Sequence, residues 1–242
     1  MTARRVLITG ASRGIGYALA ERLARLGHVP VGFARSSPAE FPGEFQEVDL
    51  ASRRATDAAL SKVLSDGPVD AVVNNVGLGR PGMLGEIDLD DLAELYDLNV
   101  RAAVQVTQAV LQSMKARGWG RIVNVTSLVT VGLIDRTAYG ASKAALEFCS
   151  RAWASELGGS GITVNSVAPG PTETGLFRQH NPEGSPSAER FLASSRLGRF
   201  ARPGEIAAAI AFLLSEEAGY ITGQTLRVDG GGSIAGATGV AA

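Results

Sequence analysis

The sequence predicts an α/β fold, a doubly wound, seven-stranded parallel sheet with helices on both faces, in a single domain over residues 1–242. Short apolar runs rich in β-branched residues alternate with segments of helical period along almost the whole chain. This alternation is typical of crossover units, which build parallel sheets. With 242 residues, 45% of them apolar, the chain fits one large domain or two small ones. Because neither a linker nor an internal repeat is visible, one domain is favoured.

The expected elements follow one another regularly. The first helix shows the pattern clearly, because Leu19, Leu23 and Leu26 recur at helical spacing. Pro30 weakens the second strand, since proline cannot donate to a strand ladder. The strands are expected at Arg5–Thr9, Val29–Phe33, Phe45–Val48, Val69–Val73, Arg121–Val125, Ile162–Val167 and Thr225–Val228. The helices are expected at Tyr17–Leu26, Ala51–Leu64, Leu89–Ala116, Ala138–Leu157 and Glu205–Leu214.

Two segments depart from this alternation. Residues 171–197 contain Pro171, Pro182 and Pro186 with several Ser and Thr residues, which predicts a surface loop or a lid. The segment follows the end of a strand, where ligands bind in such sheets, so a substrate lid is favoured over an irregular connector without a role. The tail, residues 233–242, is rich in small residues, and it either frays or packs on a neighbouring subunit.

Composition excludes several classes of function. The chain has 23 Lys and Arg against 24 Asp and Glu, so its charge gives no general reason to expect nucleic acid or an anionic membrane as a partner. The longest apolar run near the C-terminus, residues 206–214, is too short to span a bilayer. The only cysteine, Cys149, cannot form an intrachain disulfide and indicates a reducing, cytoplasmic setting. His28 and His180 are far apart in the sequence, and no metal site is expected.

A glycine-rich segment, residues 9–16, lies between the first strand and the first helix. Its spacing is G-x-x-x-G-x-G, with glycines at Gly10, Gly14 and Gly16. Glycines permit a tight turn and let the backbone approach a pyrophosphate, while the N-terminus of the following helix attracts anions. Glycines in a turn are weak evidence alone, but their place between a strand and a helix favours a nucleotide site over a mere turn.

Other motifs follow in order. Tyr139 and Lys143 form Y-x-x-x-K, and Asn74-Asn75-Val76-Gly77 is close to N-N-A-G. With the segment T-G-x-x-x-G-I-G, these motifs resemble the short-chain dehydrogenase/reductase family, from about residue 4 to about residue 232. The resemblance is greatest to bacterial 3-oxoacyl-acyl-carrier-protein reductases. It implies a Rossmann-type fold and an oxidoreductase that reduces a ketone, 3-oxoacyl or other, to a secondary alcohol, or the reverse.

The end of the second strand indicates which nicotinamide cofactor is used. An acidic residue there would bind a ribose 2′-hydroxyl and favour NAD, but Ala34 and Arg35 occupy the position. Arg35 and Arg13 suit a 2′-phosphate, so NADP(H) is expected. Asp49 is expected near adenine, although a helix cap is the alternative for it. The expected cofactor-binding residues are Gly10, Ser12, Arg13, Gly14, Ile15, Gly16, Arg35, Asp49, Leu50, Asn75, Val76, Gly77, Tyr139, Lys143, Pro169, Gly170, Thr172 and Thr174.

Tyr139 and Lys143 are four residues apart on a predicted helix, so they share one face. A phenol has a pKa of about 10, and a neighbouring ammonium would lower it toward the range of a useful acid or base. The resemblance assigns Tyr139 the proton transfer and gives Lys143 the nicotinamide ribose. It also implies that Ser127, with Thr126 as the alternative in register, bonds the substrate oxygen. Asn99 would shape its helix and hold a water in a proton relay to Lys143.

Substrate and partners are less closely defined. Leu128, Leu133, Ile134, Phe177 and Phe191, with Ser127 and Tyr139, are expected to face substrate, and core packing is the alternative for the apolar ones. Basic residues that would meet an acidic carrier protein are replaced by Gly118, Trp119 and Ser160, so a small or hydrophobic ketone is at least as good a candidate as an acyl thioester.

The family commonly forms tetramers, and a homotetramer is expected here. Phe148 and Trp153 could be contacts between subunits, or they could belong to the core. The alternative to an enzyme is an NADP-binding sensor or scaffold without turnover. The intact Tyr139 and Lys143 argue against that alternative.

Overall fold

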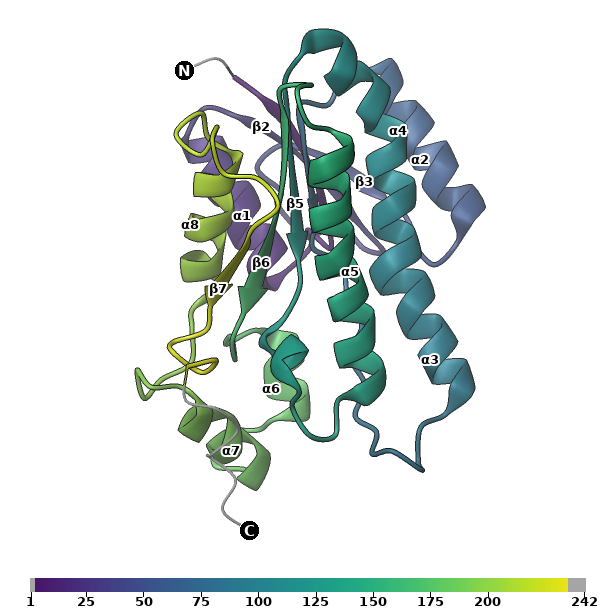
Figure 1. Cartoon of the computed structure of the whole chain (residues 1–242). Helices are drawn as coiled ribbons and strands as arrows, with labels where there is room; N and C mark the ends of the chain where they lie inside the picture. Colours follow the sequence, from purple (N-terminus) through teal and green to yellow (C-terminus); the bar gives the residue numbers. More distant parts are fainter. Residues whose placement is uncertain (1–2, 235–242) are drawn as a thin grey trace.

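Seven parallel strands form one sheet in the order β3-β2-β1-β4-β5-β6-β7 in the computed structural model, which describes residues 3–234 (Figure 1). The strands are β1 (Arg5–Thr9), β2 (Val29–Ala34), β3 (Glu44–Glu47), β4 (Ala71–Asn74), β5 (Gly120–Val125), β6 (Ile162–Pro169) and β7 (Thr225–Val228). The helices are α1 (Gly14–Arg25), α2 (Arg53–Ser65), α3 (Leu89–Tyr96), α4 (Ala102–Arg117), α5 (Thr137–Glu156), α6 (Gly175–His180), α7 (Pro186–Ser194) and α8 (Pro203–Leu214). The predicted fold class is confirmed.

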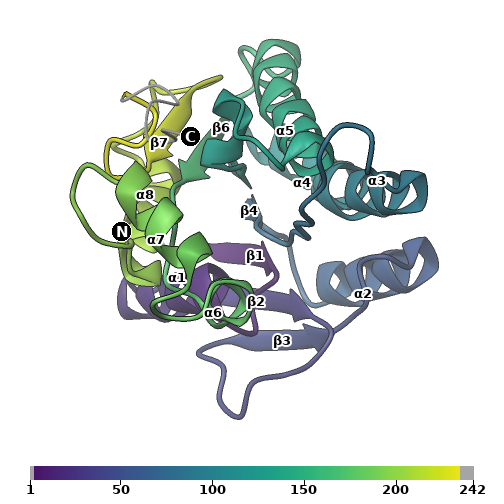
Figure 2. The same ribbon diagram turned by 90° about the horizontal axis from the view of Figure 1, so that it is seen from below.

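The core consists of one apolar layer on each face of the sheet. Side chains alternate along a strand, so Val6 and Ile8 of β1 face one layer while Leu7 faces the other. α1 and α8 cover the first face, and α2, α4 and α5 cover the second (Figure 2). All residues of β4, β5 and β6 are buried, as expected for central strands of a parallel sheet.

The strand order reverses between β1 and β4, because the chain continues from β1 through β2 to β3 on one side and from β4 to β7 on the other. At such a point the connections leave toward opposite faces of the sheet and open a crevice at the carboxyl ends of the strands. The glycine-rich segment after β1 and the loop after β4 both begin at this crevice.

The predicted helix Leu89–Ala116 is interrupted. A π-helical turn, η1 (Asp97–Arg101), separates α3 from α4. Such turns are rare in α-helices and occur often at functional sites. Asn99 lies at the middle of η1, and its side chain holds the loop after β4, which gives the turn a structural reason.

The segment 171–197 is not an irregular loop, because it contains the two short helices α6 and α7. Thr174 caps the start of α6 by accepting from Phe177 N, and Ser185 caps α7 by accepting from Ala188 N. Both helices lie beyond the carboxyl end of β6 (Figure 1). Thr174, Ser185 and Pro186, which are among the residues that suggested a loop, are therefore two helix caps and a first-turn proline.

Residues 235–242, most of the predicted tail, lie outside the described part of the chain. Among the described residues, no helix has both the length and the apolar character needed to cross a membrane.

Candidate active site

The glycine-rich segment joins β1 to α1 at the crevice. Gly10 and Gly14 have φ angles of 67° and 60°, which glycine adopts without a steric penalty. Gly16 is buried, and a Cβ at this position would stand 2.8 Å from the Asn75 amide nitrogen. α1 begins without a side-chain cap, so its first N–H groups are available to an anion. Ser12 and Ile15 are half-buried within this turn, which has the form of a pyrophosphate cradle.

Thr9 fastens the loop after β4 to the glycine-rich segment. Its hydroxyl oxygen accepts from the backbone N–H groups of Asn75 and Val76, both at 3.0 Å. The Asn75 amide donates to Thr9 O at 2.9 Å and to Gly10 O at 3.1 Å. These contacts bring Asn75 and Val76 to the cradle, although the Asn75 amide is occupied with the protein backbone.

Arg13 and Arg35 follow the neighbouring strands β1 and β2 and are both exposed. Within residues 3–234, neither guanidinium forms an ion pair. Two unpaired guanidinium groups at this edge, with no carboxylate between Phe33 and Pro38, fit a phosphate monoester. The cradle and these arginines therefore fit NADP(H).

The segment after β3 is only partly as predicted. Asp49 is exposed, and its carboxylate accepts from Ala51 N at 3.0 Å, whereas Ser52 is the residue that caps α2. The helix-cap alternative for Asp49 is therefore wrong. The Leu50 side chain is buried in the core, and its carbonyl oxygen accepts from Arg101 at 2.8 Å. The Leu50 side chain is therefore not available to a ligand.

Asn99 connects the loop after β4 with α5. Its side chain is 1% exposed, and its oxygen accepts from Leu78 N at 2.8 Å. Its nitrogen donates to Leu78 O and to Ser142 Oγ, each at 2.9 Å, and Ser142 Oγ donates to Tyr139 O at 2.8 Å. Since every polar atom of the amide has a protein partner, Asn99 positions the loop and the helix that carry the site.

Asn99→Ala leaves the two Leu78 backbone groups and Ser142 Oγ without their partner in a buried site. We expect the free energy of unfolding to fall by about 2–4 kcal/mol, because each unsatisfied buried polar group costs about 1–3 kcal/mol. Urea titration of the two proteins measures this difference. A change below about 0.5 kcal/mol would show that water replaces the amide without loss, and that the amide does not hold the loop.

Ser127 and Thr126 follow β5, and their environments differ. Thr126 is buried, and its hydroxyl donates to Val167 O at 3.2 Å. Ser127 is half-buried, its hydroxyl oxygen accepts from Val129 N at 3.3 Å, and it lies near enough to the Tyr139 phenol to lower the pKa of that group. Of these two neighbours, Ser127 is therefore the better placed to act with Tyr139.

The Tyr139 phenol lies between Ser127 and the loop after β4, where a Cβ at Gly79 would stand 3.5 Å from its Cζ. Burial raises the pKa of Tyr139 above its ordinary value, while the hydrogen bond with Ser127 and the charge of Arg136 partly oppose that rise. The expected decrease in pKa is therefore wrong for this structure, because the cost of burying a phenolate exceeds the neighbouring favourable contacts.

Lys143 lies one helical turn after Tyr139 and is 2% exposed. Its Nζ donates to Val125 O at 2.9 Å, and a Cβ at Gly77 would stand 3.0 Å from it. Burial lowers the pKa of Lys143 to about 8. Ser127, Tyr139, Lys143 and Asn99 thus come from the loop after β5, from α5 and from η1 into one constellation.

The end of β6 leads from this constellation toward the glycine-rich segment. Gly170 N donates to Val228 O at 3.0 Å, and Thr172 Oγ1 donates to Gly170 O at 2.9 Å. A Cβ at Gly14 would stand 3.2 Å from Thr174 Cγ2, so Thr174 lies against the cradle. Pro169 and Thr172 are buried, whereas Thr174 is half-buried beside Gly14.

The predicted substrate-facing residues are in three different environments. Leu128 is buried and packs against Gly232, where a Cβ would stand 2.9 Å from its Cδ2, so the core alternative holds for it. Leu133 is half-buried, and Ile134 is 59% exposed. Phe177 makes edge-to-face contacts with Phe191 at 5.5 Å and Phe200 at 5.1 Å between ring centroids, which joins α6, α7 and the segment before α8.

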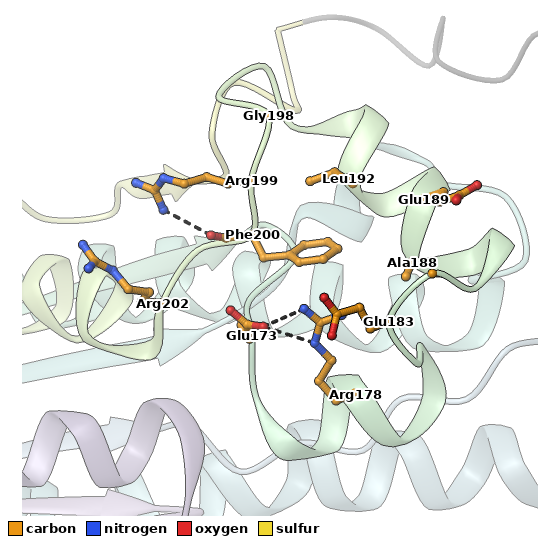
Figure 3. A pocket seen from close by; sticks show the side chains of 11 residues that line it. Glu173, Arg178, Glu183, Ala188, Glu189, Leu192, Gly198, Arg199, Phe200 and Arg202 are labelled. Carbon is orange, nitrogen blue, oxygen red and sulfur yellow. Dashed lines mark hydrogen bonds and ion pairs between the residues drawn. The ribbon is translucent and has the colours of Figure 1, made fainter.

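A pocket of about 680 Å³ lies between α6, α7 and residues 198–202 (Figure 3). Phe200 lies at its centre, and Glu173 accepts from Arg178 at its base. None of Asn99, Ser127, Tyr139 and Lys143 lines this pocket. It therefore belongs to the 171–197 segment and its neighbour rather than to the catalytic constellation. Within the described residues, no group of three or more His, Cys, Asp or Glu could hold a metal ion.

Three residues of the site were missed from the sequence. Thr9 and Ser142 hold its loops through hydroxyl groups, and their positions in the motifs gave no separate signal. Arg136 was the third, and it did give a signal, since a charged residue three places before Tyr139 lies one helical turn from it.

The comparisons with known proteins agree with this geometry. A family model described as Enoyl-(Acyl carrier protein) reductase matches residues 10–233. The 3-oxoacyl-[acyl-carrier-protein] reductases of Vibrio cholerae and Pseudomonas aeruginosa are 37% and 38% identical to the chain, over 93% of it and 95% of each relative. A solved structure described as a short chain dehydrogenase/reductase family protein is 35% identical, with a TM-score of 0.85 over 96% of this chain and 97% of that one.

A Rossmann-type sheet, a glycine cradle and a Tyr-Lys pair next to a serine define an oxidoreductase. The chain belongs to the short-chain dehydrogenase/reductase family. The predicted family and class of enzyme are therefore confirmed.

Proposed function

We propose that the protein is an NADP(H)-dependent reductase that converts a ketone, 3-oxoacyl or other, to a secondary alcohol, with Tyr139 as general acid. The observation that carries this proposal is the meeting of Ser127, Tyr139 and Lys143 at the end of β5, opposite Gly77 and the glycine cradle. The names of the curated relatives support the 3-oxoacyl group as the first substrate class to test.

The cofactor and three side chains each contribute one part of the proposed reaction. NADPH, when bound, supplies the hydride. Ser127 Oγ–H donates to the substrate carbonyl oxygen and stabilises the charge that develops there. Tyr139 then donates its phenolic proton to that oxygen. Lys143 would hold the nicotinamide sugar, and its charge would stabilise the resulting phenolate. The raised pKa of Tyr139 keeps the phenol protonated at neutral pH, which is the form that can donate to a carbonyl oxygen.

The cofactor would be held along the crevice. Gly10, Gly14 and Gly16 would contact the pyrophosphate through the backbone, and Arg13 and Arg35 would bind the 2′-phosphate. Exposed Asp49 would lie near the adenine.

Turnover of a carbonyl panel tests the proposal. The protein is mixed with NADPH and neutral ketones, 3-oxoesters and 3-oxoacyl thioesters, and the loss of NADPH absorbance is followed. We expect reduction of at least one class. Binding of NADPH without turnover of any carbonyl would favour the alternative, a sensor or scaffold.

Arg35→Asp tests the cofactor assignment. The wild-type protein should use NADPH at least about 10-fold better than NADH in kcat/KM, because a charge-assisted hydrogen bond contributes about 1.5–3 kcal/mol. The variant should lose this preference, since the carboxylate repels the 2′-phosphate and accepts from a 2′-hydroxyl. Arg54→Asp, an equal charge change at an exposed residue of α2, serves as the control. Equal use of NADPH and NADH by the wild type would contradict the assignment.

A homotetramer and a cytoplasmic location remain predictions. Phe148 of α5 is 63% exposed, which is consistent with a contact between subunits, whereas Trp153 packs against the core. Gly118, Trp119 and Ser160 lie at the amino ends of β5 and β6, opposite the end that carries Ser127. A carrier protein that used this surface would therefore not meet Tyr139 of the same chain directly.

A further inference from the structure

Arg136 occupies a distinctive position at the entrance to the proposed active site. It immediately precedes α5 and lies three residues before Tyr139. It also pairs with Gly82 in an isolated bridge, so the loop after β4 and the start of α5 meet at this residue. Its neighbour Asp135 has a φ angle of 61°, the only positive φ of a non-glycine residue within residues 3–234. Backbone strain of this kind is concentrated at functional sites.

The Arg136 guanidinium is held at one nitrogen only. Nη1 donates to Asp135 O at 2.9 Å and lies 3.4 Å from the Asp135 carboxylate. The guanidinium carbon lies 5.9 Å from the centroid of the Phe191 ring of α7, so the side chain also reaches the 171–197 segment. Among the described residues, Nε and Nη2 have no hydrogen-bond partner. The side chain is 24% exposed, which leaves this edge accessible to a small molecule.

The edge formed by Nε and Nη2 is the one that binds a carboxylate through two parallel hydrogen bonds. The Arg136 charge also reaches the reacting group, because it is among the groups that lower the pKa of the Tyr139 phenol. A ligand at the free edge would therefore lie close to Tyr139, between α5 and Phe191. The apolar side chains nearby, Phe177 and Phe191, suit a short hydrocarbon chain that joins an anionic group to a carbonyl.

We propose that Arg136 determines substrate specificity by binding a carboxylate of the substrate, so that the preferred substrates are short oxo acids rather than neutral ketones or thioesters. This inference rests on the proposed reductase function and adds the substrate class. In this proposal Asp135 positions Arg136. The Asp135 carbonyl and carboxylate accept from Nη1 of Arg136 and leave the opposite edge of the guanidinium free.

The test compares matched pairs of substrates. With NADPH, kcat/KM is measured for 3-oxobutanoate, 4-oxopentanoate and 5-oxohexanoate and for the methyl ester of each. The three lengths vary the distance between carboxylate and carbonyl. The ratio of acid to ester is the readout, because a change in the acidity of Tyr139 alters both members of a pair alike. The variants are Arg136→Gln, Arg136→Lys and the control Arg190→Gln, which removes an equal charge from an exposed residue beside Phe191.

We expect the wild type to prefer the acid at one length by about 10- to 100-fold, the effect of a paired, charge-assisted contact. Arg136→Gln should abolish the preference, Arg136→Lys should retain part of it, and Arg190→Gln should retain all of it. An acid-to-ester ratio near one in the wild type, or a ratio unchanged in Arg136→Gln, overturns the inference while leaving the reductase function intact. If Arg136→Gln fails to fold, the wild-type ratio and Arg136→Lys decide. Failure to reduce any acid, ester or thioester overturns the proposed function itself.

Discussion

Tyr139→Phe should reduce kcat/KM for ketone reduction by about 10²- to 10⁴-fold, the contribution typical of a positioned general acid. The substitution removes only the phenolic O–H, so the ring still packs against the loop at Gly79 and α5 is unchanged. The affinity for NADPH, measured by fluorescence titration, should change little, because the cradle and Arg35 are untouched. Loss of turnover with retained binding is the signature of a missing proton donor.

The matched control is Tyr220→Phe, the same chemical change at a fully exposed tyrosine. It should leave kcat/KM unchanged. If Tyr139→Phe retained wild-type turnover, Ser127 or a water would have to be the acid, and the proposed division of roles would be wrong.

The raised pKa of Tyr139 bears on how the rates of reduction and oxidation depend on pH. Below that pKa the phenol is protonated and ready to donate, so reduction should not lose its acid anywhere near neutral pH. Oxidation needs the phenolate, so its rate should rise with pH. Sequence patterns could not predict this shift, since it arises from burial between α5 and the loop after β4, whereas the pattern showed only the nearby ammonium.

The parts of the fold that depend on local periodicity were predictable. Strand β1 has Val6, Leu7 and Ile8 in succession, and α1 has leucines at one face. The π-helical turn at Asn99 was not predictable, because it reflects contacts of one amide with Leu78 and Ser142, which are remote in sequence. The helices α6 and α7 were missed because short helices rich in Pro and Ser look like loops until their caps are seen.

The residues of the site can also be divided into those that the sequence predicts and those that it does not. Ser127, Tyr139 and Lys143 were predicted because the order of motifs carries them, and the structure brings them together. The sequence could not decide between Ser127 and Thr126. The structure favours Ser127, because the Thr126 hydroxyl donates to Val167 O of the neighbouring strand and is not available to a substrate. Leu50 was assigned from its neighbour Asp49, but it lies in the turn between β3 and α2, and its side chain is in the core.

Lys143→Met has the other large expected effect, and near neutral pH it should reduce activity without reducing stability. Activity should fall by about 10²-fold or more, because the charge that stabilises a phenolate is lost. Stability should not fall with it. Burial lowers the pKa of Lys143 from 10.5 to about 8, so below pH 8 the folded protein carries a buried ammonium at a cost of about 3 kcal/mol.

The sign of the pH dependence follows from proton binding. Between pH 8 and pH 10.5 the unfolded chain binds more protons at this lysine than the folded protein does, so wild-type stability rises with pH in that window. Below pH 8 both states are protonated, and the cost is constant. Methionine carries no charge, so the variant lacks this contribution. It also leaves Val125 O without its donor, which costs about 1–3 kcal/mol at every pH.

The stability of Lys143→Met relative to wild type should therefore be equal or greater at pH 7 and should decrease by about 2–3 kcal/mol by pH 10. Urea unfolding at the two pH values measures the change. Lys62→Met, at an exposed lysine of α2, should show no such change. In the wild type, kcat/KM for reduction should decline above about pH 8 as Lys143 loses its proton. A stability difference that does not vary with pH would mean that Lys143 keeps an ordinary pKa, and that decline should then be absent as well.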